Sequence, residues 1–149
     1  MQNFVELLKD HALILAATKS LTIITQNPNP DAGAAFAALR KLARILDNHM
    51  RAEAEFIDAN HRIGDGDFAA LADQHGKRFH ELVEECRVYL REWSEENIRE
   101  DWQTFADATD WIAKHLNEQI EAENQSLYPA ALRYGLIRLL PEKERVSAN

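Results

Sequence analysis

Apolar side chains recur at spacings of three and four residues along most of this 149-residue chain. One such stretch contains Leu39, Leu42 and Leu46, and similar patterns precede and follow it. This spacing places apolar residues on one face of an α-helix, and no stretch keeps the period of two that is typical of strands. The pattern therefore predicts an all-α fold, with helices over about residues 3–25, 31–60, 67–93 and 98–134.

Turn-forming residues separate these predicted helices. Pro28 and Pro30 cannot continue a helix, and the sequence RIGDGD follows the second helix. Ser94 begins the sequence SEEN and is a typical helix cap or break, while Pro129 lies near the end of the last helix. Short links between long amphipathic helices favour an up-down-up-down four-helix bundle. We expect residues 1–149 to form a single domain of this kind with a short C-terminal tail.

Charge and composition narrow the class of partners. The net charge of −8 at pH 7 argues against nucleic acid, because phosphate binding needs clustered Lys and Arg. No apolar run approaches the roughly 18 residues of a membrane span, so no membrane partner is expected. The first residues, MQNFVELLKDH, lack the basic start and apolar block of a signal peptide, and the single Cys86 excludes an internal disulfide. The expectation is a cytoplasmic protein.

Polar side chains interrupt the apolar face of every predicted helix. They are His11 on the first, His49 and Glu53 on the second, His75 on the third, and Gln119 and Glu123 on the fourth. A buried carboxylate is costly unless it is paired or bound to a cation, although a buried His–Glu hydrogen bond is the simpler explanation for one such pair. Residues four apart lie on one helix face, one turn apart, so a divalent cation can satisfy both. Imidazole with carboxylate suits iron, manganese or zinc.

These residues lie in motifs that resemble the hemerythrin-like family, also called HHE cation-binding domains. The motifs are LLKDHALIL, LDNHMRAEAEFI, LADQHGKRF and QIEAENQSLYP, in this order along the chain. The resemblance implies a four-helix bundle that holds one or two non-haem iron ions and binds or senses oxygen or nitric oxide, or handles iron. It also implies the metal ligands, which are the terminal His11, His49 and His75 and the bridging or terminal carboxylates Glu53 and Glu123.

Gln119 stands where the fourth helix of that family supplies a histidine. Gln119 itself, as a weak ligand, and His115, one turn earlier, are alternatives for this position. A second hypothesis is a binding or regulatory module whose metal site has been depleted. A ferritin-like oxidase needs Glu-x-x-His pairs, and only Asp58 before His61 has an acid at that spacing. No nucleotide loop or nucleophile triad appears, so a classical enzyme is not predicted, while a homo-oligomer is compatible with the pattern.

Overall fold

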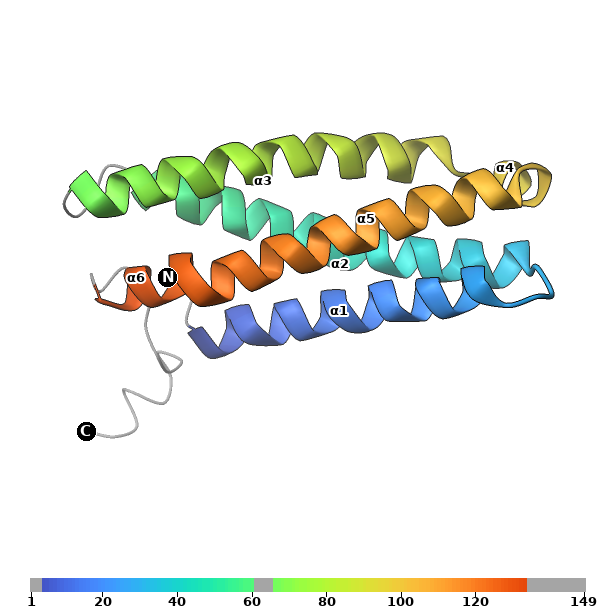
Figure 1. The fold of residues 1–149 in the computed structure, drawn as a ribbon, viewed down its shortest axis with the longest axis horizontal. Helices are drawn as coiled ribbons and strands as arrows, with labels where there is room; N and C mark the ends of the chain where they lie inside the picture. The colour runs from blue at the N-terminus through green and yellow to red at the C-terminus, as the bar shows by residue number, and fades with distance from the viewer. Residues whose placement is uncertain (1–3, 61–65, 134–149) are drawn as a thin grey trace.

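The computed structural model describes residues 4–60 and 66–133, except for the side chains of residues 4, 5, 7, 53–60, 66–69 and 72 (Figure 1). This part of the chain is all-helical, as predicted. Three of the long helices match the sequence prediction within two residues at each end. The long helices are α1 (Phe4–Gln26), α2 (Ala32–Asn60), α3 (Gly66–Glu92) and α5 (Trp102–Ala122).

The predicted single helix over residues 98–134 is wrong, because the chain forms several helical segments there. The short helix α4 (Glu95–Glu100) precedes α5, and the π-helical turn η1 (Glu123–Leu127) and helix α6 (Tyr128–Arg133) follow it. Two N-caps explain the break. Ser94 Oγ accepts from the Asn97 N–H at 3.1 Å, and Asp101 Oδ1 accepts from the Thr104 N–H at 3.3 Å. Asp101 itself has a non-helical backbone, with φ −139° and ψ 66°, as is usual for a capping residue.

The long helices lie side by side along one axis (Figure 1). Helix α1 packs against α2 and α5, helix α2 against α3 and α4, and α3 against α5. Figure 1 shows α4 at one end of the molecule, while α6 continues α5 toward the opposite end. Because η1 packs against both α3 and α6, the chain near residue 123 is held by neighbours on more than one side.

Among the described residues, the apolar core forms two clusters. The larger one includes the fully buried Leu42, Ile98 and Phe105. The smaller one lies around η1 and α6 and includes Leu127 and Tyr128 packed with Phe79 of α3. This second cluster fixes the π-helical turn against α3, close to the polar side chains described below.

Helix α1 is apolar on more than one side, which makes its buried face hard to predict. His11 and Ile14 are buried, but Leu8 and Leu15, which share the predicted apolar face, are exposed. Ile23 is exposed as well. A helix of this kind has weak amphipathic periodicity, so spacing alone does not identify the side that packs. Among the described residues, none of the helices combines the length and hydropathy that a membrane crossing requires.

Candidate metal centre

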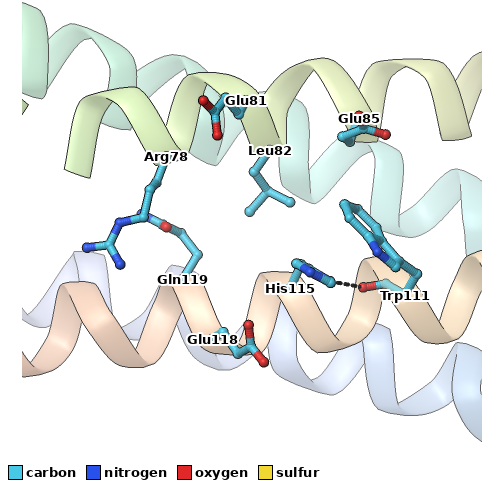
Figure 2. Close-up of a pocket in the computed structure, with 8 residues that line it drawn as sticks. All are labelled: Arg78, Glu81, Leu82, Glu85, Trp111, His115, Glu118 and Gln119. Carbon is cyan, nitrogen blue, oxygen red and sulfur yellow. Dashed lines mark hydrogen bonds between the residues drawn. The ribbon is translucent and has the colours of Figure 1, made fainter. Parts of the chain in front are cut away.

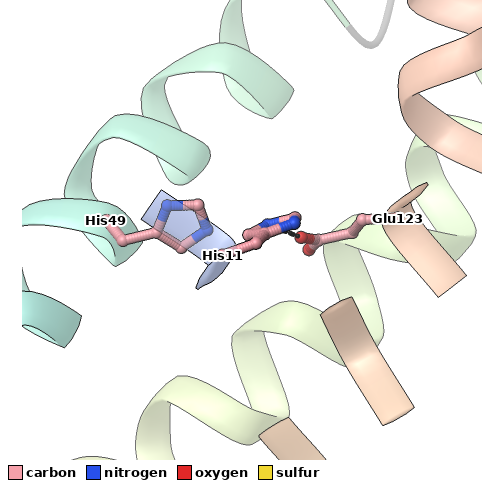
Figure 3. Close-up of side chains that lie close together, drawn as sticks. All are labelled: His11, His49 and Glu123. Carbon is pink, nitrogen blue, oxygen red and sulfur yellow. Dashed lines mark ion pairs between the residues drawn. The ribbon is translucent and has the colours of Figure 1, made fainter. Parts of the chain in front are cut away.

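Three ionisable side chains from three helical segments converge inside the molecule (Figure 3). His11 comes from α1, His49 from α2 and Glu123 from the first position of η1, with 1%, 5% and 1% of their surfaces exposed. One ligand atom of each lies within 4.8 Å of the ligand atoms of the other two. Donor atoms bound to one tetrahedral ion at about 2.0–2.2 Å lie about 3.3–3.6 Å from one another, so these donors would have to move closer together to share an ion.

The His11 ring is held through both nitrogens by adjacent residues of η1. Its Nδ1–H donates to Asn124 Oδ1 at 2.8 Å, and since an amide oxygen only accepts, Nδ1 carries the hydrogen. Nε2 lies 3.0 Å from Glu123 Oε1. In a neutral ring this contact would bring two lone pairs together. A proton or a cation between these atoms makes the contact favourable.

The Nδ1 atom of His49 also faces an oxygen acceptor, which is a carboxylate oxygen of Asp10. Its Nδ1 lies 3.4 Å from Asp10 Oδ2, so the Nδ1–H donates weakly to a half-buried carboxylate of α1. A neutral His49 then has its lone pair on Nε2. The rings of His11 and His49 meet edge to face, with centroids 4.8 Å apart. Metal-ligating histidines characteristically donate their second N–H to an oxygen acceptor, and both histidines here do so.

The two oxygens of Glu123 have different neighbours. Gln119 Nε2 donates to Oε2 at 2.8 Å, while Tyr128 Oη lies 3.4 Å from Oε1 and 3.1 Å from His11 Nε2. The Tyr128 ring also stacks on the His11 ring, with centroids 5.2 Å apart. Among the buried side chains that the structure describes there is no Lys or Arg. A protonated histidine or a bound cation would offset the charge of Glu123 in this part of the core.

The π-helical turn explains how consecutive residues reach the same ring. The Tyr128 N–H bonds to the Glu123 carbonyl, five residues back, in place of the usual four. Glu123 and Asn124 then contact the two nitrogens of His11, and Tyr128 stacks on its face. Single π-helical turns inside α-helices are frequent at functional sites. Here the turn directs three side chains toward one imidazole.

The structure brings together three of the five predicted ligands, His11, His49 and Glu123. His75 is buried on α3 but lies outside this group. Glu53 belongs to α2, and its side chain lies outside the described part, so its role stays a prediction. The alternative His115 stacks on Trp111 with ring centroids 3.8 Å apart, and its Nδ1–H donates to the Trp111 carbonyl.

Three further polar residues of the site, Asp10, Asn124 and Tyr128, were not predicted from the sequence. Asp10 and Asn124 are the immediate neighbours of predicted ligands, which is a weak signal, because adjacent residues usually point to different sides of a helix. Tyr128 belongs to the Leu-Tyr-Pro ending of the fourth motif, and this ending was the sequence feature that could have indicated it.

Chemically, two imidazoles and one carboxylate in a buried layer form a donor set for a divalent transition metal. Imidazole and carboxylate suit iron, manganese and zinc alike, so the donor set does not choose among them. Comparison of the chain with protein-family models, curated proteins and solved structures found no match.

Proposed function

We propose that this chain is a hemerythrin-like non-haem iron protein, folded as an up-down-up-down four-helix bundle, that binds or senses oxygen or nitric oxide or handles iron. The observation that carries the proposal is the buried group of His11, His49 and Glu123. In it, each imidazole has its second nitrogen held by an oxygen atom, from Asn124 or Asp10. Side-by-side helices and short connections support the bundle.

In this proposal His11, His49 and Glu123 hold one or two iron ions, with His75 and Glu53 as further ligands. Iron held by imidazole and carboxylate supplies the redox chemistry and the coordination positions that diatomic gases require. The chain itself orients the donors, through Asn124 and Asp10 behind the rings, and excludes water by burying them. Manganese and zinc fit the same donors and are the alternatives.

The first test is the metal content of untagged protein, purified in air and then supplied anaerobically with ferrous iron. We expect about one or two iron ions per chain in the wild type and a large loss in His49→Ala, since a terminal ligand is removed. His80→Ala is the matched control, because His80 is exposed on α3 and should bind as the wild type does. Equal metal content in both variants would argue against the proposed centre.

A second candidate function is a metal-depleted binding or regulatory module. The observation in its favour is that Gln119, Asn124 and Tyr128 supply hydrogen bonds to Glu123 and His11, so a proton on His11 could stabilise this group without an ion. Wild-type protein that takes up no iron, manganese or zinc under the conditions above would favour this candidate.

A further inference from the structure

A cavity of about 380 Å³ lies between α3 and α5 (Figure 2). Three exposed carboxylates line it, Glu81 and Glu85 from α3 and Glu118 from α5. Arg78 is the one Lys or Arg among the lining residues, so acids outnumber strong bases three to one. Clustered carboxylates raise the local concentration of cations, and Arg78 offsets only part of their charge. This cavity therefore favours cations.

One side chain connects the cavity with the centre. Gln119 lines the cavity with only 9% of its surface exposed, and its Nε2 donates to Glu123 Oε2 at 2.8 Å. Glu123 in turn lies 3.0 Å from His11. The Gln119 side chain thus contacts both the acid-lined cavity and a carboxylate of the centre. Its carbonyl oxygen is a hard donor of the kind that divalent cations bind.

We propose that the cavity between α3 and α5 is the uptake route by which a divalent cation reaches the centre. Glu81, Glu85 and Glu118 attract the ion, and Gln119 is the positioning residue that closes the inner end of the route and holds Glu123. This inference rests on the proposed function, because it requires a metal at His11, His49 and Glu123.

Uptake kinetics test the route separately from the centre. Ferrous iron is added anaerobically at low ionic strength, and unbound iron is followed with a chromogenic ferrous chelator. In the triple variant Glu81→Gln, Glu85→Gln, Glu118→Gln we expect uptake to slow by about tenfold. The final iron content should match the wild type, because no proposed ligand is changed. Raising the salt concentration should reduce the difference, since salt screens exposed charges.

A matched triple variant distinguishes the effect of the cavity carboxylates on the uptake rate from the effect of the overall charge. Glu84→Gln, Glu92→Gln and Asp110→Asn remove the same number of charges from the same two helices, at exposed positions outside the cavity. This control should take up iron at nearly the wild-type rate. If both triple variants slow uptake equally, or neither does, the route is overturned while the centre stands. Wild-type protein that binds no iron overturns the proposed function and the route together.

Gln119→Ala tests whether Gln119 closes the inner end of the route. If Gln119 closes the route, its truncation should accelerate both uptake and release of iron to the chelator by several fold. A purely structural role, in which Gln119 only holds Glu123, predicts a lower final iron content with no gain in uptake rate. The second result would overturn the assignment of Gln119.

Discussion

At the scale of single residues, the candidate centre depends on the two oxygen atoms that accept hydrogen bonds from the Nδ1 atoms of its histidines. Asn124 Oδ1 fixes the hydrogen of His11 on Nδ1, and Asp10 Oδ2 does so more weakly for His49. Each acceptor therefore directs the lone pair of its histidine to Nε2. Neither residue would bind metal itself, yet both set the tautomer that binding requires.

Asn124→Ala should weaken metal binding about 10- to 100-fold while the fold is retained, because His11 loses the acceptor that orients it. The dissociation constant for ferrous iron, measured anaerobically by chelator competition, checks this expectation. Asn117→Ala is the control, since Asn117 is an exposed amide on α5. Equal affinities in the two variants would show that Asn124 does not orient a ligand.

Cys86 gives an expectation for alkaline pH. Burial, and to a lesser degree the nearby charge of Glu85, raise the pKa of its thiol from 9.0 to about 12. The unfolded chain ionises this thiol at lower pH than the folded chain does. The neutral thiol therefore contributes its full stability below about pH 9, and this contribution is lost as pH rises toward 12.

The free energy of unfolding, from urea titrations at about pH 7 and about pH 10, tests the effect of Cys86. Between these values the wild type should lose about 1 kcal/mol more than Cys86→Ala. The pKa of Tyr89 is also raised to about 12, mainly by burial and to a lesser degree by the charge of Cys86. The part due to burial is common to both proteins and cancels in the comparison. Parallel losses in the two proteins would contradict the expectation.

At the scale of helical elements, the π-helical turn η1 is the segment that local sequence rules do not favour. It leaves the regular α-helical bonding pattern between Glu123 and Leu127, and in return it presents Glu123, Asn124 and Tyr128 to His11. A departure from local preference at a candidate site is expected where function and stability compete.

Deleting the exposed Ser126 should convert the turn into continuous α-helix. We expect the thermal midpoint to stay the same or rise, because regular helical bonds are restored, while iron affinity falls at least tenfold as Glu123 and Asn124 change direction. Circular dichroism melts and chelator competition measure the two effects. A deletion variant that binds iron as the wild type does would show that the turn is not required.

The sequence predicted the elements that depend on local chemistry. Pro28 and Pro30 ended the first helix, and Ser94 was recognised as a cap or break. The break at Asp101 was missed because an aspartate within a polar stretch reads equally well as the exposed face of a helix. The π-helical turn could not be predicted, since it is held by contacts of Tyr128 with His11, 117 residues away.

The candidate site likewise combines features that local sequence predicts with features that depend on long-range packing. Residues that interrupt an apolar face, such as His11, His49 and Glu123, were recognisable from spacing. Their mutual distances depend on how α1, α2 and η1 are packed, and spacing does not fix that packing. His75 is buried on α3 but lies outside this group of described residues, and its role as a ligand stays a prediction.

At the scale of the whole molecule, the buried polar group has a cost for folding. Most of the core is aliphatic and aromatic, but His11, His49 and Glu123 bring ionisable groups into it with no buried Lys or Arg among the described residues. Burying such groups is unfavourable until a cation or proton offsets their charge. Metal binding should therefore appear in the stability of the whole chain, since the unfolded chain holds no preformed site.

Ferrous iron at about 100 times its dissociation constant should stabilise the wild type by about 2.7 kcal/mol, which corresponds to a rise of about 5–10 °C in the thermal midpoint for a chain of this size. Anaerobic melts followed by circular dichroism measure the rise. His80→Ala should show the full rise and His49→Ala little or none, because His49 belongs to the buried group and the exposed His80 does not. A similar rise in both variants would place the iron at the acidic surface, whereas a rise confined to the wild type and His80→Ala would link the stability of the bundle to its centre.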